Sequence, residues 1–285
     1  RRKKHGLQIA LGQLDERGIN YYFTFTVNDY EQEGLEKSVP PLVERLATFR
    51  RLSKRLGRER VVWRFDPIIV GGPLTPESIL GKIRRVGEQL HDDTSKLVIS
   101  FVDSARYRNV RENLRRSGAG EWGEPGLEAV CRIARGIQRL NESWGLDVAS
   151  CAEEVDLSAC GIVRNRCVDD GLMARAFAHD SSLMAFLGCG GGSAPALFGK
   201  GLAGANPLKD SGQRKSCGCI VSQDIGRYGT CPHHCVYCYA NSSFRQANDA
   251  YKRHLPGSEE SEWSGAADDF KATVLTGQPR IITIK

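Results

Sequence analysis

All ten cysteines of this 285-residue chain lie between Cys131 and Cys238, and the first 130 residues contain none. A secreted disulfide scaffold distributes its cysteines through a shorter chain. The N-terminal residues also predict no signal peptide, because the apolar stretch that follows Arg1–Lys4 is short and interrupted by polar residues. We therefore expect reduced thiols in a cytoplasmic protein. Clustered cytoplasmic thiols indicate metal or redox chemistry.

The composition is that of an ordinary globular domain, with 40% hydrophobic and 26% charged residues. It excludes a disordered chain and a collagen-like fibre. No stretch reaches 18 apolar residues, so we expect no membrane span and no membrane partner. The formal net charge is +6, of which the four basic residues 1–4 supply four charges. Charge therefore gives no argument for a nucleic-acid partner.

Short β-rich runs alternate with amphipathic helical stretches along the chain. The sequence predicts strands at 21–27, 61–70, 96–102 and 146–151, and weaker ones at 218–222 and 279–285. It predicts helices at 42–56, 77–90 and 127–144. This alternation is typical of repeated βα units with a mainly parallel sheet. We therefore expect an α/β fold, in the form of a partial TIM-like barrel.

Composition also divides the chain into four parts. These are a βα-repeat barrel portion at 1–180, a Gly-rich loop or insertion at 181–216, a cluster-binding segment at 217–243 and a C-terminal tail at 244–285. In α/β folds the chemistry lies at the carboxyl ends of the strands. The acidic residues expected at those ends are Asp66, Asp103, Glu153 and Glu154.

The densest thiol pattern is the segment Cys231-Pro-His-His-Cys235-Val-Tyr-Cys238. A tight loop with this spacing can direct three thiolates at one inorganic centre. It differs from a zinc ribbon, which supplies two pairs of ligands, because one coordination position is left for another molecule. The pattern suits a [4Fe–4S] cluster that has one open iron.

The Cys-x3-Cys-x2-Cys spacing, with an aromatic residue before the last cysteine, resembles the signature of the radical S-adenosylmethionine (SAM) superfamily. The resemblance implies that Cys231, Cys235 and Cys238 bind the cluster and that Tyr237 packs near the adenine of SAM. It further implies reductive cleavage of SAM to a 5′-deoxyadenosyl radical, which abstracts hydrogen from an unidentified substrate. The electron donor would be a flavodoxin or a ferredoxin. Acidic residues near a strand end, here Glu153 and Glu154, would bind the ammonium group of SAM.

Several flanking segments resemble the bacterial family called domain of unknown function 1848, which is counted among radical-SAM-like proteins. They are residues 21–26, 62–69, 99–103, 151–158, 213–219 and 224–230, and the resemblance covers about residues 20–243. Radical SAM barrels usually carry the cysteine loop after their first strand, whereas here the βα units precede it. The resemblance therefore implies a circularly permuted barrel. It also implies that N-terminal strands present in other members are missing here.

A second set of cysteines consists of Cys151, Cys167, Cys217 and Cys219. By the same resemblance, these four match the family pattern better than Cys160 and would hold an auxiliary iron–sulfur cluster, used for sulfur transfer, substrate binding or electron transfer. Zinc binding and unrelated free thiols are the alternatives. For the protein as a whole, the alternative to an enzyme is a non-catalytic protein with a structural zinc or iron–sulfur site.

Overall fold

The computed structural model describes residues 11–118, 122–189, 208–214, 216–222, 228–253 and 281–284. Most of the expected Gly-rich loop and most of the expected tail lie outside the described residues. The strands are β1 (Asn20–Thr26), β2 (Val61–Ile68), β3 (Val70–Gly71), β4 (Lys96–Phe101), β5 (Trp122–Gly123), β6 (Asp147–Ser150), β7 (Val163–Arg164) and β8 (Ile281–Ile284). The α-helices are α2 (Leu42–Leu56), α3 (Pro76–Leu90), α4 (Arg108–Arg116), α5 (Leu127–Trp144), α6 (Asp170–Ala176), α7 (Ser181–Phe186) and α8 (Phe244–Arg253).

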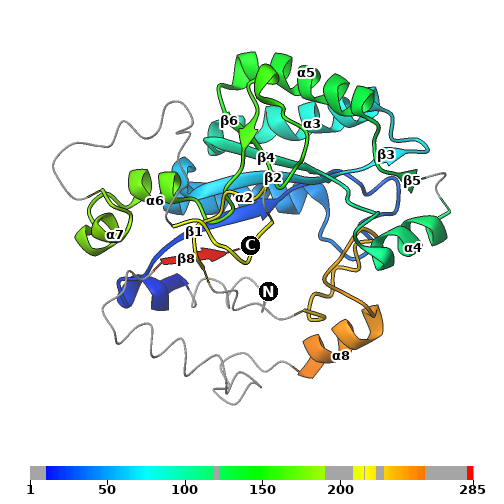
Figure 1. Ribbon diagram of the computed structural model, residues 1–285. Helices are drawn as coiled ribbons and strands as arrows, with labels where there is room; N and C mark the ends of the chain where they lie inside the picture. The colour runs from blue at the N-terminus through cyan, green and yellow to red at the C-terminus, as the bar shows by residue number, and fades with distance from the viewer. Residues whose placement is uncertain are drawn as a thin grey trace.

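Six strands form one parallel sheet in the order β7-β6-β4-β2-β1-β8 (Figure 1). From β1 to β7 the strands cross the sheet in the order in which they occur in the chain, and β8 pairs with the free edge of β1. The described strands leave this sheet open between β7 and β8. The predicted α/β fold with a parallel sheet is confirmed, whereas closure into a barrel is not seen in the described residues.

Most of the predicted elements are present with nearly the predicted bounds. The late strand expected at 279–285 is β8. The weak strand expected at 218–222 is not formed, because the structure has only an isolated bridge between Lys209 and Ile220 there. This segment is short and contains Gly218 and two cysteines, so little of it favours extended pairing.

Helices α2, α3 and α5 cover one face of the sheet (Figure 1). The strand β2 illustrates why: Trp63 and Phe65 are fully buried against the helices, and the intervening Arg64 is on the opposite face. Alternation of side chains along a strand produces this separation. The opposite face is covered in part by α6 and α7, whose apolar side chains pack on Tyr22 and Val62. No helix in the described ranges is long and apolar enough to cross a membrane.

The packing of α3 on α5 depends on a close approach at Gly87. A Cβ atom at this position would lie 2.2 Å from Cη2 of Trp144. We therefore expect Gly87→Ala to lower the free energy of unfolding by about 1–3 kcal/mol, the usual cost of overpacking a core. Gly81, on the same helix, has nothing within 4 Å of the corresponding position. Gly81→Ala should leave stability unchanged or raise it by up to about 1 kcal/mol. Urea denaturation of both variants tests this, and equal stability of the two would contradict it.

Candidate functional site

The cysteine loop 231–238 is docked on the segment that follows β1. The backbone N–H of Val236 donates to the carbonyl of Leu35 at 2.9 Å, and Glu36 forms an antiparallel bridge with Cys235. Because β1 ends at Thr26, this segment continues from the carboxyl edge of the parallel sheet. A loop near the end of the chain is thereby placed beside the first strand, where α/β folds carry their chemistry.

Tyr237 anchors the loop. Its hydroxyl donates to Oε1 of Glu36 at 2.6 Å and accepts from Nδ2 of Asn28 at 3.2 Å. Its ring meets that of Tyr30 edge to face, with 6.0 Å between the centroids. Burial, and after it the Glu36 carboxylate, raise the pKa of Tyr237 well above its usual range, so the phenol stays a hydrogen-bond donor. The contacts described for Tyr237 thus hold the loop in place, and its expected packing near adenine stays a prediction.

The three loop thiols differ in exposure. Cys231 is exposed, whereas Cys235 and Cys238 are half-buried. Burial, followed by the charge of Glu36, raises the pKa of Cys235 to about 12. On its other side the loop contacts α4, where Nδ2 of Asn109 donates to the carbonyl of Cys238 at 3.3 Å. The loop is therefore held between the segment after β1 and helix α4.

The ring nitrogens of His234, within the loop, have partners outside it. Nε2 lies 3.0 Å from Oδ1 of Asn248, and Nδ1 lies 3.5 Å from Oγ of Ser38. The ring is thus held by α8 and by the segment after β1, away from a role as a ligand. Across the described ranges, no three cysteine, histidine or acidic side chains are already arranged around a common point as in a formed metal site. Ligation by the loop thiols stays a prediction.

Asp66, near the end of β2, is held by several neighbours. Its carboxylate accepts from Nε of Arg64 at 3.0 Å and from the hydroxyl of Ser100, at the end of β4. Its backbone N–H donates to Oδ1 of Asn28 at 2.8 Å. Since Asn28 also contacts Tyr237, the backbone of Asp66 belongs to the same hydrogen-bond network as the cysteine loop.

The structure separates the two predicted SAM ligands Glu153 and Glu154. Oε1 of Glu153 accepts from the backbone N–H of Phe101 at 2.7 Å, at the end of β4. Burial, with a contribution from the charges of Asp66 and Asp103, raises the pKa of Glu153. Glu154 is exposed. Glu153 is therefore the member of the pair that lies at the carboxyl ends of the strands.

A group that the sequence analysis missed connects residue 214 to the cysteine loop. Nη1 of Arg214 lies 3.3 Å from Oδ2 of Asp103, and Nη2 donates to the hydroxyl of Tyr107 at 2.8 Å. The ring of Tyr107 stacks on that of Tyr239, with 5.0 Å between the centroids. Asp103 was expected at a strand end and Arg214 lies in one of the segments that resemble the family, but the contacts of Arg214 with Asp103 and Tyr107 join residues dispersed along the chain and leave no local pattern.

The four predicted auxiliary cysteines lie together, and we call them the four-thiol group. The sulfurs of Cys151 and Cys167 are 3.4 Å apart. The backbone N–H of Cys167 donates to Sγ of Cys219 at 3.1 Å, and that of Cys219 to Sγ of Cys217 at 3.5 Å. Cys160, the alternative member, packs against the helix-side core instead. The structure therefore brings this set together, and metal binding by it stays a prediction.

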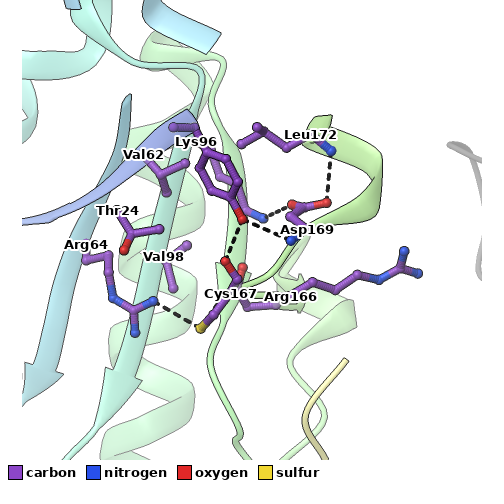
Figure 2. A pocket seen from close by; sticks show the side chains of 11 residues that line it. Thr24, Val62, Arg64, Lys96, Val98, Arg166, Cys167, Asp169 and Leu172 are labelled. Atoms are coloured by element: carbon purple, nitrogen blue, oxygen red, sulfur yellow. Dashed lines mark hydrogen bonds and ion pairs between the residues drawn. The ribbon is translucent and has the colours of Figure 1, made fainter. Parts of the chain in front are cut away.

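Arg64 connects the four-thiol group to the strand-end carboxylates. Its Nη1 donates to Sγ of Cys167 at 3.2 Å, and the other side of the guanidinium contacts Asp66, as Figure 2 shows for the sulfur contact. Contacts with Cys151 and Cys219, and the charge of Arg64, lower the pKa of Cys167 well below its usual range, although burial acts in the opposite direction. The contact with Cys167, followed by burial, raises the pKa of Cys151 and that of Cys219 well above the usual range. This face of the sheet thus carries a buried cation beside a cluster of sulfurs.

The model of one protein family, domain of unknown function (DUF1848), matches residues 1–240 of the chain. The chain belongs to the DUF1848 family. No curated protein and no solved structure matches this DUF1848 chain. The family named from the sequence is therefore confirmed, and its match begins earlier than the residue 20 expected above. The superfamily assignment stays a prediction.

The DUF1848 match covers both groups of cysteines and most of the residues around them. The cysteine loop, the four-thiol group, Glu153 and Arg214 all fall within residues 1–240. Helix α8 and strand β8 follow the matched part. The two groups of cysteines are thus both part of the DUF1848 domain.

Proposed function

We propose that this DUF1848 protein is a radical SAM enzyme in which Cys231, Cys235 and Cys238 hold a [4Fe–4S] cluster. The observation that carries the proposal is the docking of a three-thiol loop at the carboxyl edge of a parallel sheet, beside strand-end carboxylates. When bound, a cluster with one open iron supplies the coordination site and the electron for reductive cleavage of SAM to a 5′-deoxyadenosyl radical.

The strand order supports a barrel-type scaffold for this chemistry. Successive strands of this six-stranded sheet are neighbours from β1 to β7, and β8, the last strand in the described ranges, pairs in parallel with β1. Sequential neighbours and a last strand beside the first match the order of a βα barrel. The same order also fits an open α/β sheet with its switch point at β1. We retain the partial TIM-like barrel as part of the proposal.

The donor set of the loop fits a cluster with an open position. The loop offers three thiols within eight residues, while the ring nitrogens of His234 are engaged by Asn248 and Ser38. A structural zinc site takes four protein ligands, whereas three thiolates leave one position for a bound cofactor. The exposure of Cys231 would also give a flavodoxin or ferredoxin access to the centre.

The neighbouring side chains would position SAM and shield it. The half-buried carboxylate of Glu153 is oriented by the N–H of Phe101 and would bind the ammonium group of SAM. Tyr237, whose hydroxyl contacts Glu36, would hold the cysteine loop close to the carboxyl ends of the strands. The stack of Tyr107 on Tyr239 would shield one side of the loop from water. The substrate and its class are left open, and the cytoplasmic location expected from reduced thiols belongs to the same proposal.

Production of 5′-deoxyadenosine from SAM tests this function. The chain is reconstituted anaerobically with iron and sulfide, reduced with dithionite and incubated with SAM, and the product is measured by liquid chromatography with mass spectrometry. We expect 5′-deoxyadenosine to form in an amount that increases with time. A protein that binds metal but forms no 5′-deoxyadenosine above the protein-free control would instead be the non-catalytic metal protein.

A further inference from the structure

We propose that the four-thiol group, Cys151, Cys167, Cys217 and Cys219, is a structural zinc site that is separate from the cysteine loop. Three stretches of chain meet in it: the end of β6, the residues after β7 and the segment 216–220. The inference goes beyond the proposed function and does not rest on it.

The spacing of the sulfurs favours a single metal ion. Four thiolates around Zn²⁺, each bonded at about 2.3 Å in a tetrahedron, lie about 3.8 Å from one another. The sulfurs of Cys151 and Cys167 are already 3.4 Å apart, so this pair needs only a small displacement to bind one ion. Backbone N–H contacts connect the other two sulfurs to this pair, from Cys167 to Cys219 and from Cys219 to Cys217. The four cysteines of a [4Fe–4S] cluster each bind a different iron, so their sulfurs are held apart by the whole cluster.

Several N–H groups point at these sulfurs. The sulfur of Cys167 accepts from Nη1 of Arg64 at 3.2 Å and from Nδ2 of Asn165 at 3.4 Å. The sulfur of Cys219 accepts from the backbone N–H groups of Cys167 at 3.1 Å and of Val168 at 3.5 Å. The sulfur of Cys217 accepts from the backbone N–H of Cys219 at 3.5 Å. A neutral thiol is a weak acceptor, whereas a thiolate is the form that binds metal. Donors that surround ligand atoms are typical of metal sites. These donors therefore suit sulfurs that lose their protons when a metal ion binds.

Burial and charge lead to the same conclusion. Cys217 and Cys219 are only 8% and 5% exposed. Several thiolates cannot be buried together without a cation, because an unpaired buried charge is very costly. The guanidinium of Arg64 supplies one positive charge, and it is shared with Asp66. A divalent ion bound by the four sulfurs would add two positive charges to this region.

The site would fasten the segment that leads into the cysteine loop. In the described part of this segment, the hydroxyl of Ser216 donates to the carbonyl of Ala152 at 3.2 Å, and the N–H of Ile220 donates to the carbonyl of Val168 at 3.3 Å. The side chain of Ile220 packs with Tyr22 and Val62 of the sheet. Structural zinc supplies folding free energy directly to segments of this kind. The role assigned to the ion is therefore to join β6, β7 and the segment 216–220.

Metal analysis of a loop variant tests the proposal. In the protein with Cys231→Ser, Cys235→Ser and Cys238→Ser, purified from medium supplemented with zinc and iron, we expect about one zinc per chain and no iron. Adding Cys219→Ser should remove the zinc, whereas adding Cys160→Ser, a matched substitution outside the group, should leave it. About four irons in the loop variant, or zinc retained without Cys219, would overturn the proposal.

X-ray absorption at the zinc edge gives a second test on the unaltered chain, in case a variant fails to fold. We expect a shell of four sulfur atoms at about 2.3 Å. A protein that contains no zinc, or zinc bound by nitrogen or oxygen, would contradict the site. A failure of SAM cleavage would leave the zinc result unchanged, so the two proposals succeed or fail separately.

Discussion

In the Cys235→Ala protein, 5′-deoxyadenosine production from SAM is expected to fall about a hundred-fold or more. Even the loss of a residue that only supports a metal ligand costs 10–100-fold in metal affinity or activity, and Cys235 is proposed as a ligand itself. Its removal leaves two thiols, Cys231 and Cys238, for a cluster that needs three. The measurement compares reconstituted wild-type and variant proteins under identical reducing conditions, with iron counted in each.

Cys131→Ala is the matched control, because Cys131 lies on α5, outside both groups of cysteines. It should retain the iron content and the SAM cleavage rate of the wild type. If Cys235→Ala cleaves SAM at the wild-type rate, the assignment of the loop is wrong. If Cys131→Ala loses as much activity as Cys235→Ala, the loss does not come from removal of a cluster ligand. That outcome would also contradict the assignment of Cys235 as a ligand.

Arg64→Ala is expected to lower the free energy of unfolding by about 3–5 kcal/mol, the usual effect of removing one partner of a buried ion pair. Arg64 is 9% exposed, and its guanidinium contacts both the Asp66 carboxylate and the sulfur of Cys167. Its loss leaves the carboxylate and the sulfur without their shared cation. Urea denaturation, monitored by circular dichroism at a fixed metal content, gives the value.

The control for this substitution is Arg108→Ala, which removes an ion pair with Glu112 on the surface of α4. Exposed ion pairs on a helix surface contribute little to stability, so the change should be much smaller than that of Arg64→Ala. A loss below about 1 kcal/mol for Arg64→Ala would show that Arg64 does not carry the buried network assigned to it.

Much of the sheet and of its helix layer follows from local pattern. The apolar and aromatic run in β2 is a strong signal because this strand is buried on both faces. The helical spacing of apolar residues in α3 and α5 is strong because each helix buries one long face. The start of α3 was also readable, since the hydroxyl of Thr75 accepts from the N–H of Ser78 and Pro76 follows. Helices α6 and α7 were missed because, at seven and six residues, they show too little periodicity.

The site was predictable in its thiols but not in its supports. Cysteine spacing gave the loop, and the four cysteines proposed as a second set do lie together. The contacts that place both groups, such as Tyr237 with Glu36, join residues 201 positions apart and leave no local signal. The sequence did not distinguish Glu153 from Glu154. The backbone turns at Ala152, which has a φ of 57°, and after this turn Glu153 lies at the strand ends whereas Glu154 is exposed to solvent.

The most direct test of the central claim is the electron paramagnetic resonance spectrum of the anaerobically reconstituted, reduced protein, recorded with and without SAM. A cluster held by Cys231, Cys235 and Cys238 should give about four irons per chain and a reduced-cluster signal whose g-values shift when SAM is added. A protein that takes up no iron, or a signal that SAM leaves unchanged, would contradict an open coordination site in this loop and with it the radical SAM assignment.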